Sequence, residues 1–119
     1  MVINFDPKSW LESYDSAVPV AETAFTPRDE AGRPRRIHSK FIVFHDDQDA
    51  DGADLSTDYI AHDLTIELYT KDGNDRAFRD WLLRQDIHFQ RRLIWLPTEQ
   101  MFESIFYLTD TVHEKIQKE

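Results

Sequence analysis

The stretch that decides the fold is YIAHDLTIELY, residues 59–69. Side chains on a strand point alternately to two faces, so a period of two indicates a strand. One face of this strand carries Ile60, His62, Leu64, Ile66 and Leu68, and the other carries Tyr59, Asp63, Thr65 and Glu67. Because His62 lies in the middle of the apolar face, we predict that it is a hydrogen-bonded core histidine and not a ligand.

Other strand signals lie on both sides of this stretch. The dense apolar run FIVF predicts a strand over residues 37–44, followed by an acidic loop over residues 46–57. Residues 87–96 and 101–109 predict an antiparallel hairpin around the turn PTEQ, residues 97–100. Residues 18–25 predict a short extended segment at a sheet edge, because Pro19 cannot donate to a ladder of hydrogen bonds.

Two helices complete the prediction. Asp6 and Pro7 are typical of a helix start, and an apolar stripe that includes Phe78 and Trp81 predicts a helix over residues 75–85. We expect one α+β domain over residues 1–119, with an N-terminal helical segment at 1–17 and a polar helix or tail at 110–119. Its predicted core is a mostly antiparallel four-stranded sheet of two hairpins, with the helices packed on one face.

Composition and charge exclude several classes of function. The 119 residues include 23 acidic and 14 basic side chains, a formal net charge of -9, which disfavours binding to nucleic acid or anionic lipid. There is no cysteine, so thiol chemistry is excluded. The sequence contains no apolar run of the roughly 20 residues that a membrane span needs. The N-terminus lacks signal-peptide features, so we expect cytoplasmic synthesis.

The acidic loop carries the sharpest motif. Its carboxylates and glycine match the spacing of a calcium loop: Asp47, Asp49, Asp51, Gly52 and Asp58. Strands rather than helices flank the predicted loop, and its last position is an aspartate rather than the usual glutamate. The alternative interpretation is a solvated hairpin connection in which Gly52 makes the turn. A calcium site is therefore a hypothesis, and no other cofactor is predicted.

The sequence has no signature of catalysis. It contains no nucleophile elbow, phosphate-binding glycine loop or histidine pattern for zinc, so we predict that the protein is not an enzyme. Arg91, Arg92, Trp95 and Tyr107 instead suggest a surface that faces another protein, because interfaces favour these residue types. The alternative is that the aromatic rings pack in the core.

Several segments match, in order, a group of small phage and prophage proteins. They are VPVA at residues 18–21, KFIVF at 40–44, the Ala53-Asp54 loop, DLTIELYTKD at 63–72 and WLPTEQMF at 95–102. Over residues 18–109 the chain resembles tail components of the terminator or head–tail joining type. The resemblance implies a structural subunit without a cofactor, assembled as a hexameric ring in the virion tail. Its implied partners are the tail-tube protein and the head–tail connector proteins.

Two other hypotheses stay open. The chain could be a monomeric or dimeric adaptor domain from a mobile element that binds one protein. It could also be a divalent-metal module built on Asp47, Asp49, Asp51 and Asp58. Native mass separates the ring from the adaptor, and calorimetry with calcium and magnesium tests the metal module.

Overall fold

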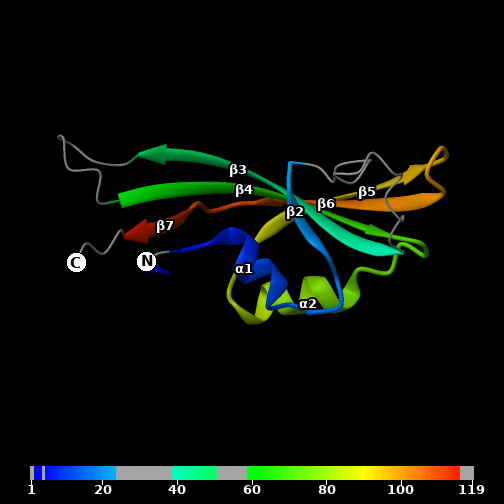
Figure 1. Ribbon diagram of the computed structural model, residues 1–119, viewed down its shortest axis with the longest axis horizontal. Coiled ribbons are helices and arrows are strands. Elements are labelled where there is room, and N and C mark those ends of the chain that lie inside the picture. The colour runs from blue at the N-terminus through cyan, green and yellow to red at the C-terminus, as the bar shows by residue number, and fades with distance from the viewer. Residues whose placement is uncertain (1, 4, 24–38, 51–58, 116–119) are drawn as a thin grey trace, which may run out of the picture.

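The structure is a computed structural model that describes residues 2–3, 5–23, 39–50 and 59–115. Its described elements are β1 (Val2–Ile3), α1 (Pro7–Glu12), β2 (Val20–Glu22), β3 (Lys40–Ala50), β4 (Tyr59–Thr70), α2 (Arg76–Arg84), β5 (Phe89–Leu96), β6 (Met101–Leu108) and β7 (Val112–Lys115). The strands form one mixed sheet, which carries two short helices (Figure 1). Neither described helix is long and apolar enough to cross a membrane.

Strand β4 is the centre of the sheet, as its alternating sequence predicts. On one side it pairs antiparallel with β3 over eleven positions, from Lys40 opposite Thr70 to Ala50 opposite Ile60. On its other side it pairs antiparallel with β6 near its C-terminal end and with β7 near its N-terminal end. The β5–β6 hairpin is confirmed, with Leu96 opposite Met101 across the predicted turn.

A bulge separates β6 from β7. Tyr107 and Val112 are five positions apart, whereas their partners on β4, Thr65 and His62, are only three apart. The two extra residues form a break that ends one strand and bends the chain before the next, as bulges do.

The prediction of a four-stranded antiparallel sheet is wrong. Setting aside the two-residue β1, six strands form a mixed sheet in which β2 pairs parallel with β3, and β1 itself adds a parallel pair with β7. Residues 23–39 separate β2 from β3, and a connection of that length allows the parallel crossover that a tight hairpin turn forbids. Burial of Val18 and Val20 in the core then fixes β2 beside β3.

The prediction of a helix or tail after residue 110 is also wrong over the described part of that segment. Residues 112–115 form β7, although they have few apolar side chains. The strand is held inward by Glu114, which is buried and contacts His62 on β4. A polar contact replaces the apolar anchor, so the segment has no hydrophobic period that could predict a strand.

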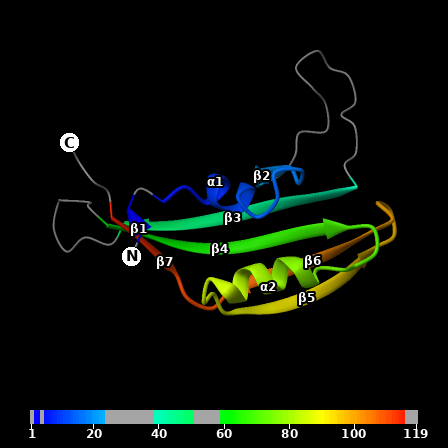
Figure 2. The same ribbon diagram turned by 90° about the horizontal axis from the view of Figure 1, so that it is seen from below.

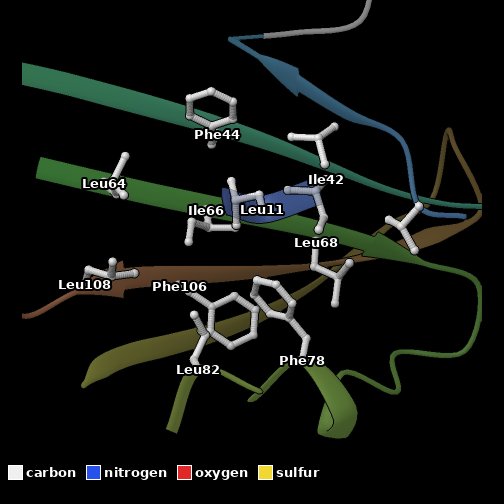
Figure 3. Close-up of a cluster of buried hydrophobic side chains, with 12 residues drawn as sticks. Leu11, Ile42, Phe44, Leu64, Ile66, Leu68, Phe78, Leu82, Phe106 and Leu108 are labelled. Carbon is white, nitrogen blue, oxygen red and sulfur yellow. The ribbon is translucent and has the colours of Figure 1, made fainter. Parts of the chain in front are cut away.

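Both helices pack on the same face of the sheet. Leu11 from α1 and Phe78 and Leu82 from α2 meet an apolar layer from four strands: Val20, Ile42, Phe44, Leu64, Ile66, Leu68, Phe106 and Leu108 (Figure 3). Figure 2 shows α2 lying along the part of the sheet that β5 and β6 form. The opposite face carries the odd-numbered residues of β4 and their cross-strand partners, and we call it the helix-free face.

Candidate functional site

His62 is enclosed by two carboxylates from neighbouring strands. Its Nδ1 lies 2.7 Å from an oxygen of Asp46 on β3, and its Nε2 lies 2.7 Å from an oxygen of Glu114 on β7. Only 2% of the His62 side chain is exposed, and the ring of Phe5 packs edge-on against it with 5.2 Å between the centroids. The prediction of a hydrogen-bonded core histidine is confirmed.

This arrangement favours the charged form of the imidazole. Burial alone lowers the pKa of His62, but the hydrogen bonds to Asp46 and Glu114 and their negative charges outweigh it, so the net pKa is raised. A neutral imidazole has only one N–H, whereas an imidazolium can donate to both carboxylates at once. The cluster is therefore an ion triad that joins β3, β4 and β7.

The triad has the components of acid–base chemistry but not the access. Both ring nitrogens of His62 are engaged, and the Asp46 and Glu114 side chains are 1% and 8% exposed. A general base must come within hydrogen-bond reach of a substrate proton, and this imidazole has no free nitrogen with which to do so. The geometry supports a structural role for His62.

A second polar cluster lies on the helix-free face. The Tyr69 hydroxyl donates to Glu103 at 2.7 Å and lies 3.2 Å from an oxygen of Glu67. Burial, the bond to Glu103 and the charge of Glu67 all raise the pKa of Tyr69. The pKa of Glu103 is raised as well. Burial and the charge of Glu67 raise it, and together they outweigh the hydrogen bond from Tyr69, which lowers it. Tyr69 therefore keeps its proton and serves as a hydrogen-bond donor between the two carboxylates.

The acidic segment does not begin as a loop. The predicted loop over residues 46–57 is corrected over its first five positions, which continue β3 as far as Ala50. Asp47 and Asp49 are thus strand residues, whereas Asp51 and Asp58 lie outside the described residues. Within the described part of the chain, no three histidine or acidic side chains are grouped so that they could hold a metal ion. Calcium binding stays a hypothesis that these residues do not test.

Asp47 faces another carboxylate across the sheet. It lies directly opposite Asp63 in the β3–β4 ladder, and both side chains are exposed. Like charges directly opposite one another destabilise a strand pair. Together with Gln48, Ala61 and Thr111 they line a hollow of about 350 Å³, which we call the acidic hollow. The hollow concentrates negative charge where a cationic group would be stabilised.

Strand β5 is an exposed sheet edge. Of the described strands only β6 pairs with it, and most of its eight residues are exposed. Leu93 and Trp95 are 42% and 44% exposed, on the face that α2 only partly covers. Natural proteins usually shorten, charge or cover such edges, because unpaired backbone groups bind other strands. Here the charges lie only at Arg91 and Arg92, which leaves residues 93–96 apolar.

The two β5 arginines differ in their surroundings. Arg91 forms an ion pair with Asp75, the residue before α2, and the same carboxylate pairs with Arg79 at 3.0 Å. This contact attaches β5 to α2. Arg92 is exposed on the helix-free face and has no ion pair with any described side chain. Arg92 is therefore available to a partner.

A second open edge lies at the other side of the sheet. Strand β2 pairs only with residues 42–44 of β3. Beyond that point, no described strand pairs with the outer side of residues 45–50, which read HDDQDA (Figure 1). The sheet thus has one open edge that is basic and apolar and another that is acidic.

Sequence reasoning found part of this site. It singled out Arg91, Arg92, Trp95 and Tyr107 as a possible protein-facing surface, and the exposure of both rings, 44% and 43%, excludes their burial in the core. It missed the contacts of Asp46 and Glu114 with His62, which lie 16 and 52 positions away. Separations of that size carry no local signal.

Comparison with protein-family models, with curated proteins and with solved structures found no match. The resemblance to phage tail components therefore rests on the sequence segments alone.

Proposed function

We propose that this chain is a non-catalytic structural subunit that works by joining its sheet edge to other protein. The observation that carries the proposal is β5, an eight-residue edge strand with exposed Leu93 and Trp95. Addition of a strand to such an edge uses the backbone for affinity and alternate side chains for specificity. Aromatic residues and arginine are also the types enriched at protein interfaces.

The internal use of the polar clusters supports the non-catalytic part of the proposal. His62 is enclosed by Asp46 and Glu114, and Tyr69 bridges Glu67 and Glu103. Asp75 is committed to Arg79 and Arg91. These titratable groups stabilise the sheet and its contact with α2, because each is paired with another side chain of the same chain.

The sequence resemblance gives the proposal its specific form. It is a phage or prophage tail component of the terminator or head–tail joining type, with the tail-tube protein and the connector proteins as partners. In this form the chain is made in the host cytoplasm and resides in the virion tail as a hexameric ring. The adaptor from a mobile element differs from this form by being a monomer or dimer.

Native mass tests the proposal. Light scattering on a sizing column, over a series of protein concentrations, should show wild-type species larger than a monomer. Leu93→Lys places a charge on the open edge and should return the protein to a monomer. The matched control is Leu83→Lys, because Leu83 is 53% exposed and lies on α2 rather than on the edge strand. A Leu93→Lys protein with the wild-type mass, or a wild type that stays monomeric at every concentration, would contradict the proposal.

A further inference from the structure

We infer that the partner of β5 is a second copy of this chain, which offers residues 45–50 of its β3. In this contact Arg92 of one copy meets the acidic hollow of the next, at Asp47 and Asp63. The inference rests on the proposed function and names both the partner and its contact surface.

The charges of the two edges are complementary. The β5 sequence FQRRLIWL has two arginines and no acidic residue, whereas residues 45–50 have no lysine or arginine and carry Asp47 and Asp49 besides Asp46, which is buried against His62. A chain with a net charge of -9 repels its own copies on average, so association needs a local pairing of opposite charges. Arg91 is held by Asp75, which leaves Arg92 to make that pairing.

The sheet register places these groups on the same face. Arg92 lies opposite Ile105, Ile105 opposite Glu67, and Glu67 opposite Val43, so all four lie on the helix-free face. Asp47 lies four positions after Val43 on β3, and Asp63 lies four positions before Glu67 on β4. An even separation along a strand keeps residues on the same face, so both aspartates lie on the helix-free face. A sheet that continues into a second copy, with the helices on the same side, therefore places Arg92 on the same face as the acidic hollow, where the two can meet.

The acidic hollow is suited to a guanidinium group. Asp47 and Asp63 are directly opposite one another, and their repulsion destabilises the pair in the isolated chain. A guanidinium presents several N–H donors in a planar fork and can bond both carboxylates. The hollow, about 350 Å³, is also lined by polar Gln48 and Thr111. Docking of Arg92 would relieve the repulsion between the two carboxylates, because one guanidinium would bind both.

The two contacting surfaces differ, so the association is head-to-tail. Strands β6 and β4 separate β5 from β3, which places the two edges roughly 14 Å apart across three strand spacings. The β5 edge of one chain therefore cannot pair with the β3 edge of the same chain. A contact of this heterologous kind builds either a closed ring or an open filament.

Engineered disulfides test the contact, because the chain has no cysteine of its own. Arg92→Cys and Asp47→Cys proteins are oxidised separately and as an equimolar mixture, then separated on a non-reducing gel. The expected result is a linked dimer in the mixture and little in either protein alone. A dimer in Arg92→Cys alone would overturn the inference in favour of β5 pairing with β5. No dimer in any sample would also overturn it.

Charge reversal separates this inference from the proposed function. Arg92→Glu and Asp47→Arg should each weaken self-association by at least about tenfold, since like charges then face each other. The double variant should restore it, and Arg84→Glu on the exposed face of α2 should change it little. If Leu93→Lys abolishes association but neither reversal does, β5 still docks protein and only this contact is overturned. If none of the three has an effect, both fail.

Discussion

At the scale of single residues, His62 on β4 links its strand to β3 and β7 through two buried side-chain contacts. Its ring is 2% exposed and lies between Asp46 and Glu114, so the three strands meet through buried charges. Removal of one partner from a buried ion cluster leaves the others without compensation, which is much more destabilising than loss of a surface pair. The histidine is therefore a residue on which stability depends strongly.

Replacement of His62 by alanine should lower the free energy of unfolding by about 3–5 kcal/mol, because Asp46 and Glu114 would stay buried without their cation. Urea unfolding followed by circular dichroism measures this change. His88→Ala is the matched control: the His88 side chain is 64% exposed, so its removal should matter by less than about 0.5 kcal/mol. Equal stabilities of the two variants would refute the buried-triad account.

The raised pKa of His62 predicts a dependence of stability on pH. The folded state binds the imidazole proton more tightly than the unfolded chain, so this contribution is complete below pH 6.5 and is lost as pH rises through the folded-state pKa. The free energy of unfolding, measured by urea titration, should fall over that alkaline range, with a slope of at most about 1.4 kcal/mol per pH unit.

A Glu114→Gln variant is the control for this pH dependence. Its side-chain amide can donate to a neutral imidazole, so the slope should become flatter than in the wild type. A wild-type midpoint that stays constant or rises above pH 6.5 would show that the triad does not hold its proton as described.

At the scale of elements, Phe78 is the buried aromatic residue through which α2 packs on the sheet. Phe78 is fully buried and contacts the rings of Tyr14, Trp81 and Phe106 at centroid distances of 5.0, 5.6 and 5.1 Å. Leu83, on the same helix, is 53% exposed. Substitutions at these two positions therefore test different contributions: Phe78 reports on the packing of the helix against the sheet, and Leu83 on the helix propensity of an exposed position.

Phe78→Ala should destabilise the protein by about 3–5 kcal/mol, because it removes buried surface and leaves a cavity. Leu83→Ala should change stability by less than about 0.5 kcal/mol, because it removes an exposed side chain from a helix that alanine favours. Chemical unfolding of both variants measures the difference. Similar losses in the two proteins would mean that α2 does not dock through Phe78.

The acidic segment gives a prediction about metal. Four of its loop positions, residues 47–50, lie in extended β3, whereas a calcium loop must curl so that its ligands converge at 2.3–2.6 Å from the ion. We therefore expect isothermal titration calorimetry with calcium or magnesium to give no binding heat at about millimolar ion, the range of the weakest calcium modules. Heat that disappears in Asp47→Asn would restore the metal module.

At the scale of the whole molecule, the net charge of -9 limits the possible partners. Within the described residues, the arginines lie on α2 and β5, while four of the aspartates, Asp46, Asp47, Asp49 and Asp63, lie apart from them in β3 and β4. This separation of charge permits contact between copies although the average potential is repulsive. It does not create the continuous basic surface that a phosphate backbone requires.

We accordingly expect no binding to DNA. Fluorescence anisotropy of a labelled duplex at physiological salt should stay constant up to about 100 µM protein, a concentration at which basic proteins bind nonspecifically. A salt-dependent rise in anisotropy would show that the Arg91–Arg92 region overcomes the overall charge. Arg92→Glu would then be the variant that removes the rise.

The sequence by itself determined the elements that have a local period. Alternation over residues 59–69 predicted β4, the apolar stripe with Phe78 predicted α2, and two apolar runs around PTEQ predicted the β5–β6 hairpin. Each signal comes from neighbours along the chain, which face the same solvent or core at a fixed spacing. The buried position of His62 was predictable for the same reason.

Only the tertiary structure decided the rest. The parallel β2, the strand β7 and the extension of β3 to Ala50 depend on partners that are distant in sequence. Glu114 and Asp46 read as ordinary surface carboxylates until folding brings them to His62, and the edges of a sheet exist only once its strand order is set. Contacts between distant residues have no period along the chain, so local patterns cannot encode them.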